Sequence, residues 1–86
     1  ATALVGGMNF TWCGQSCGST SRAFIHQDIY EAVLDLVKVK IKAFRPGIPT
    51  DMRTTMGAIV SRQQFDRVMS YIEIGKSEGA HLLTGG

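Results

Sequence analysis

Two cysteines, Cys13 and Cys17, lie four residues apart in a segment rich in glycine and hydroxyl side chains. A thiol is a useful nucleophile when it is partly exposed, lies near hydrogen-bond donors and can lose its proton to a base. Cys17 suits this role, because it lies between Ser16 and Gly18, where glycine permits the close approach of a substrate. Its backbone N–H would also be placed to stabilise an oxyanion. Cys13 follows Trp12 and is more typical of a packed thiol.

The cysteine spacing by itself leaves other roles open. Cysteine commonly behaves as a small buried hydrophobe, so a purely structural role is one of them. A redox sensor that forms a reversible disulfide is another, although the spacing Cys-x-x-x-Cys differs from the usual Cys-x-x-Cys. A zinc site is disfavoured, because only His26 and His81 are available as further histidine ligands and both lie in strand-like runs. We therefore predict no metal site.

The elements that would position the cysteine loop, residues 9–21, can be predicted on both sides of it. Residues 1–8 have the apolar spacing of a helix, although Gly6 and Gly7 weaken it. Residues 22–26 form a short apolar run that predicts a buried strand. Asp28 and Glu31 have the spacing of a capping box. The helix that follows ends before Pro46, and its apolar face consists of Ile29, Val33, Leu36, Val37, Ile41 and Phe44.

The second half of the chain predicts one more helix and one more strand. Residues 45–60 contain prolines and glycines without periodicity and predict an irregular connection. Ser61 and Gln64 form a second capping-box spacing, and Gly79 is a natural helix stop. Residues 80–84 then predict a strand. Because the strands are separated by helices, the fold class predicted is α/β with parallel strands.

The composition excludes several classes of protein. Of the 86 residues, 44% are hydrophobic and 19% are charged, which is ordinary for a globular protein. No run approaches the roughly 20 apolar residues that cross a membrane. The net charge of +2 comes from basic residues along one helix and the next loop, so we expect no nucleic-acid partner. The missing signal peptide and the low cysteine content favour a cytoplasmic location.

Several short motifs match one known family in order and spacing. Gly14-Gln15-Ser16-Cys17, followed by Ser21-Arg22, resembles the active-site motif of the aldehyde dehydrogenase superfamily. The similarity continues through Asp28-Ile29-Tyr30, Met56-Gly57, Ser61, Gln64, Tyr71-Ile72, Gly75, Glu78-Gly79-Ala80 and Leu83-Thr84-Gly85-Gly86. Two positions depart from the family pattern: Trp12 replaces a usual Asn, and Ala58 a frequent Pro. The resemblance, the missing initiator Met and the end at Gly85-Gly86 make residues 1–86 an expected internal part of the catalytic domain.

The resemblance also implies a reaction and a set of site residues. Cys17 would be the catalytic nucleophile of an NAD- or NADP-dependent oxidation of a small-molecule aldehyde, through a thiohemiacetal and a thioester. Gln64 and Arg67 would contact the cofactor, although Gln64 has an alternative role in capping the helix that begins after Ser61. A glutamate base and an oxyanion Asn would lie before Ala1, so the isolated chain should be inactive. The parent enzyme would be a homodimer or homotetramer. The alternatives are a non-catalytic scaffold and the cysteine redox sensor.

Overall fold

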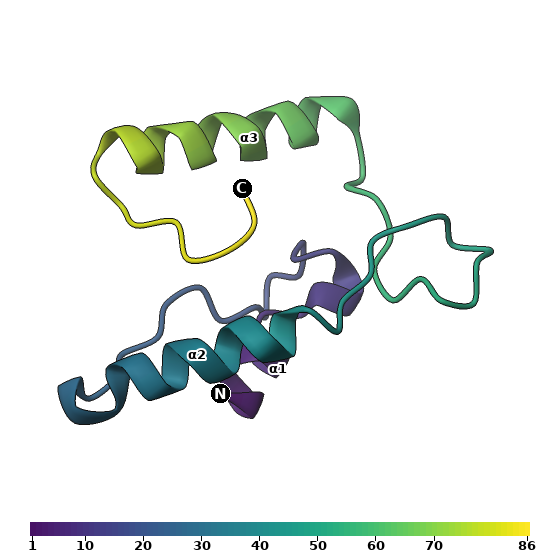
Figure 1. The fold of residues 1–86 in the computed structure, drawn as a ribbon. Helices are drawn as coiled ribbons and strands as arrows, with labels where there is room; N and C mark the ends of the chain where they lie inside the picture. Colours follow the sequence, from purple (N-terminus) through teal and green to yellow (C-terminus); the bar gives the residue numbers. More distant parts are fainter.

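The computed structural model describes all residues from 1 to 86, and every regular element in it is helical. The elements are α1 (Thr2–Gly7), the 3₁₀ turns η1 (Phe10–Trp12) and η2 (Gln27–Ile29), α2 (Tyr30–Ile41) and α3 (Arg62–Ser77). The short helix α1 packs against α2, whereas α3 lies apart from both. The segment after α3 turns back beneath that helix (Figure 1).

The predicted α/β fold class, with parallel strands at residues 22–26 and 80–84, is wrong for this structure. Neither run forms a strand, and the only β-type pairing is an isolated bridge between Pro46 and Met56. An apolar run favours an extended backbone, but a strand also requires a neighbour with which to exchange hydrogen bonds. Neither run finds such a neighbour, and the Phe24 side chain is 96% exposed. Periodicity therefore identified the apolar runs without showing what they pair with.

The beginning of α2 also differs from the prediction. Asp28 does not cap the helix through its side chain; instead its N–H donates to Nδ1 of His26 at 3.3 Å and opens the turn η2. The α-helix proper begins at Tyr30 and ends at Ile41, before Pro46 is reached. The predicted apolar face is correct at its centre, where Val37 is buried against α1, but Ile29 and Leu36 are about half-exposed.

Helix α3 begins and ends as its sequence predicts. The Ser61 hydroxyl oxygen accepts a hydrogen bond from the Gln64 N–H at 3.1 Å, which satisfies one of the free donors of the first turn. At the other end Gly79 has φ +89°, and the Gly79 and Ala80 N–H groups donate to the carbonyls of Lys76 and Gly75. This pair of bonds is a Schellman motif, which favours glycine because the backbone is left-handed there.

The hydrophobic core is very small. Only Val5 and Val37 are buried, and the chain exposes 6999 Å². A folded monomer of 9.3 kDa exposes about 5,000 Å². The chain thus buries only roughly half of the area of its unfolded state, less than is usual for its size. The longest helix, α3, has 16 residues, and none of the helices could span a membrane.

Candidate active site

The cysteine loop turns sharply just before the Gly-Gln-Ser-Cys motif. Asn9 and Cys13 both adopt left-handed backbone conformations, with φ of 53° and 59°, and Gly14 follows with φ 69°. The turn is held by backbone hydrogen bonds, of which that from Cys13 N–H to the Phe10 carbonyl measures 2.8 Å. Two consecutive left-handed residues reverse the chain direction, and glycine adopts this conformation without strain. The motif therefore begins at a reversal of the chain directly after η1.

Cys17 is exposed near the far end of this loop, and its thiol forms no disulfide. Its backbone N–H donates no hydrogen bond to any group of the chain. The next N–H, that of Gly18, donates to the Ser16 hydroxyl oxygen at 3.2 Å, which fixes the backbone on either side of the cysteine. An accessible thiol beside an unengaged N–H is a suitable arrangement for attack on a carbonyl group, because the developing oxyanion needs a donor.

The end of the loop is fixed to α1 by a close backbone contact. The Thr20 N–H donates to the Gly7 carbonyl at 2.8 Å. A Cβ atom at Gly7 would lie only 2.5 Å from Thr20 Oγ1, so the absence of a side chain permits this approach. The 12 residues between Gly7 and Thr20, Cys17 among them, are thereby closed into a loop on α1.

The start of the motif contacts the segment that leads into α3. Gln15 Oε1 accepts a hydrogen bond from the Val60 N–H at 3.1 Å, across 45 residues of sequence. A hollow of about 500 Å³ lies at this contact and is lined by Cys13, Gly14, Gln15, Ile59, Val60, Gln64 and Val68. The structure therefore brings Gln64 to the cysteine loop, whereas Arg67 is exposed on α3 and does not line the hollow.

Sequence reasoning missed Ile59, Val60 and Val68 as neighbours of the motif. They are ordinary apolar residues in a connection and a helix, and no spacing relates them to Cys17. Cys13 is half-buried in the wall of the hollow, so it is less exposed than Cys17. No three side chains of a kind that binds metal ions gather anywhere in the chain.

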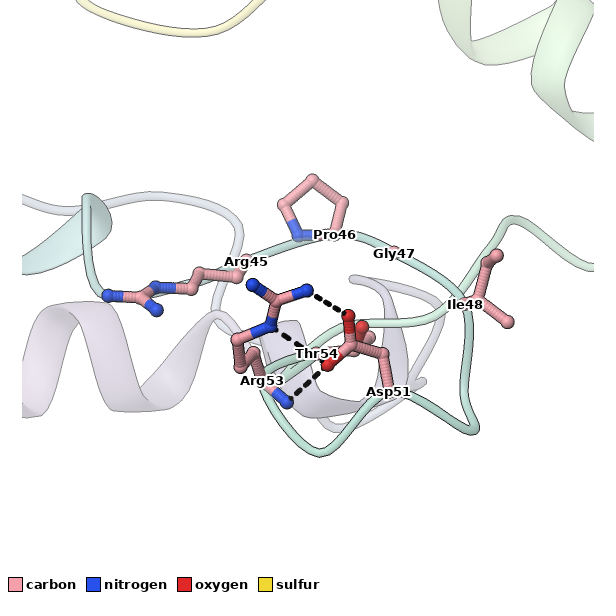
Figure 2. Close-up of a pocket in the computed structure, with 7 residues that line it drawn as sticks. All are labelled: Arg45, Pro46, Gly47, Ile48, Asp51, Arg53 and Thr54. Carbon is pink, nitrogen blue, oxygen red and sulfur yellow. Dashed lines mark hydrogen bonds and ion pairs between the residues drawn. The ribbon is translucent and has the colours of Figure 1, made fainter.

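A second hollow, of about 240 Å³, lies in the connection between α2 and α3. The Arg53 side chain donates to both carboxylate oxygens of Asp51, at 3.1 and 2.8 Å. The Arg53 backbone N–H donates to the same carboxylate (Figure 2). These hydrogen bonds hold the pKa of Asp51 below its ordinary value. The bonds from the Arg53 side chain contribute most, and the bond from the Arg53 backbone N–H contributes less. Arg45 points away from this pair. The charge of Arg53 is already compensated, so we assign the hollow a role in closing the turn.

Comparisons with known proteins agree with the motif. Residues 1–86 match the Aldehyde dehydrogenase family. An aldehyde dehydrogenase of Talaromyces stipitatus is 55% identical over 84 residues, which cover 96% of this chain and 16% of that protein. An EPTC-inducible aldehyde dehydrogenase of Rhodococcus erythropolis is 45% identical over 73 residues, 85% of this chain and 14% of the relative.

A 1-pyrroline-5-carboxylate dehydrogenase of Halalkalibacterium halodurans is 44% identical over 77 residues, 90% of this chain and 15% of the relative. No solved structure matches the chain significantly. The chain thus spans about one-sixth or less of the length of these relatives. Because the family match covers every residue, including the cysteine loop, the chain belongs to the aldehyde dehydrogenase family.

Proposed function

We propose that the protein to which these residues belong oxidises an aldehyde to a carboxylic acid with NAD or NADP, and that Cys17 is its nucleophile. The family membership of the whole chain supports the reaction class. The observation that carries the residue assignment is the exposed, unpaired Cys17 thiol at the end of the Gly-Gln-Ser-Cys motif. Cys13, the other thiol, is half-buried and is not part of that motif.

The chemistry of Cys17 follows from its surroundings. The thiolate adds to the carbonyl carbon of the aldehyde, a carbon–sulfur bond forms, and the carbonyl electron pair moves to oxygen. The free N–H of Cys17 is available to donate to that oxyanion. When bound, a nicotinamide cofactor supplies the acceptor for the hydride that leaves the tetrahedral carbon. As the hydride leaves, the oxyanion electron pair reforms the carbonyl group and gives a thioester of Cys17. Water then cleaves this thioester, releases the acid and returns the thiol.

The fit of a nicotinamide cofactor to this chain depends on Gln64. Gln64 lines the hollow beside Gly14 and Gln15, and its side-chain carboxamide forms no hydrogen bond with the protein. A carboxamide both donates and accepts, so it suits the hydroxyl groups of a ribose. The Gln64 N–H is bound by Ser61, and this capping role is compatible with a free side chain. Arg67 is exposed beyond the hollow, so we assign the contact to Gln64 first.

The alternative of a redox sensor would use the same two free thiols, but their spacing, Cys-x-x-x-Cys, differs from the usual redox motif Cys-x-x-Cys. Two cysteines in 86 residues are too few for the disulfide framework of a small secreted domain, and on that ground we propose a cytoplasmic location.

The test is replacement of Cys17 in the full-length protein. We expect Cys17→Ser to lower kcat for aldehyde oxidation by at least about a thousandfold, since loss of a nucleophile removes the covalent route. Cys13→Ser is the matched control, because it makes the same change in the same loop, and it should keep most of the activity. Full activity of the Cys17→Ser protein would refute the assignment. A protein inactive in both its native form and the Cys13→Ser variant would instead be the non-catalytic scaffold.

A further inference from the structure

We propose that Gln15 is a positioning residue, whose side-chain oxygen holds the cysteine loop against the segment that begins α3. The proposal rests on the proposed role of Cys17 as nucleophile. Through this bond the loop that carries Cys17 is placed relative to Gln64, which lies across the same hollow.

The hydrogen bond between Gln15 Oε1 and the Val60 N–H is the longest-range side-chain hydrogen bond of the chain. It joins residues 45 apart, whereas every other side-chain hydrogen bond joins residues ten or fewer apart. No backbone hydrogen bond connects residues 9–19 with residues 45–61. The Gln15 carboxamide is thus the single hydrogen-bonded link between the two segments.

Both ends of the link are attached to groups that matter for the proposed reaction. Gln15 lies two residues before Cys17, in the turn that Gly14 makes possible. Val60 lies one residue before Ser61, whose hydroxyl oxygen binds the Gln64 N–H at 3.1 Å. Two hydrogen bonds in series, each of 3.1 Å, therefore connect the nucleophile loop with the first turn of α3.

The strength of the link sets the size of the expected effect. The bond is neutral and lies in an exposed region, so water competes for both groups. A neutral hydrogen bond changes an equilibrium by about two- to tenfold. Losing it should reduce by that factor the ratio of correctly placed to misplaced molecules. Because no other hydrogen bond links the two segments, the misplaced state should then be well populated. Misplacement of reacting groups lowers kcat, so the expected fall in kcat is of that order, about two- to tenfold.

Two replacements separate the acceptor from the bulk of the side chain. Gln15→Met has a similar length and no oxygen, whereas Gln15→Glu keeps an acceptor oxygen for the Val60 N–H. Because the added charge of Glu acts on the nearby thiolate, kcat is compared on the high-pH plateau of each pH profile. In the full-length protein we expect Gln15→Met to lose two- to tenfold in kcat with KM for the aldehyde unchanged. Gln15→Glu should have a plateau value of kcat close to that of the native protein.

Hydrogen exchange at the Val60 amide gives a readout that does not depend on catalysis. Exchange should accelerate about two- to tenfold in Gln15→Met and stay near the native rate in Gln15→Glu. Unchanged exchange or unchanged kcat in Gln15→Met would overturn the proposal. An equal loss of kcat in Gln15→Glu would overturn it as well. Activity retained by Cys17→Ser refutes the nucleophile assignment instead, even where Val60 exchange behaves as expected. The two failures are therefore distinguishable.

Discussion

A methyl group added at Gly7 tests whether the cysteine loop is held on α1 by close contact. The Cβ atom of Gly7→Ala would lie 2.5 Å from Thr20 Oγ1, 3.2 Å from Thr20 Cγ2 and 3.4 Å from Thr20 Cβ. The shortest of these distances is well inside ordinary contact, so the Thr20 side chain or the backbone beneath it must move. Gly6, next to it in the same helix, has nothing within 4 Å of an added Cβ.

The two glycines form a matched pair whose difference isolates the contact. Neither has a positive φ, so alanine fits the helical backbone at both positions. Replacing glycine by alanine inside a helix raises the free energy of unfolding by up to about 1 kcal/mol. Overpacking costs about 1–3 kcal/mol. We therefore expect Gly6→Ala to be neutral or stabilising, and Gly7→Ala to have a free energy of unfolding about 1–3 kcal/mol lower than Gly6→Ala.

Urea unfolding of the two full-length variants measures this difference, and alkylation of Cys17 by iodoacetamide reports whether the loop has moved. The double replacement Gly7→Ala with Thr20→Ala removes both Oγ1 and Cγ2, and should recover most of the lost stability. Equal unfolding free energies for Gly6→Ala and Gly7→Ala, or no recovery in the double variant, would show that Gly7 is not required for the close approach.

Two further predictions concern α3 and the connection before it. Ser61→Ala removes the acceptor of the Gln64 N–H and should lower the unfolding free energy by about 1 kcal/mol. The control Ser70→Ala, inside the same helix, should be neutral or stabilising, and equal losses in urea unfolding would contradict the capping role. The second prediction concerns the ion pair in the connection: Arg53→Gln should raise the pKa of Asp51, whereas Arg45→Gln should leave it unchanged. A carboxyl ¹³C NMR titration measures this pKa. Because the pKa of Asp51 is lowered in the folded protein, the ion pair stabilises the protein at pH values above the ordinary carboxyl pKa. That contribution disappears as the pH falls through the pKa of the folded state. The Arg53→Gln variant should lack this pH-dependent contribution.

The helices could be predicted because their signals are local. Ser61 caps α3 and Gly79 ends it, both through contacts with residues at most a few positions away. The start of α2 was predicted less well, since His26 rather than Asp28 provides the acceptor that opens the turn η2 before it. Capping depends on the side-chain conformation as well as on spacing, and no side chain caps the first turn of α2 in the structure.

The strands and most of the site could not be predicted in the same way. Residues 22–26 and 80–84 have the composition of strands, but a ladder requires partners that the pattern does not identify. The left-handed conformation of Cys13 was also unexpected, because a residue other than glycine seldom adopts it. The family resemblance implied that Gln64 contacts the cofactor, but no local spacing predicts that it lies beside the motif.

The sequence alone determined the motif that contains Cys17, the family and the ends of α3, because each depends on residue types at short separations. Only the tertiary structure decided that Thr20 closes the loop on Gly7 and that Gln15 reaches Val60. Both contacts depend on the path of the backbone between residues distant in sequence, and many sequences with the same local pattern would follow other paths. Cys17 lies between these two contacts, exposed and with its backbone N–H free.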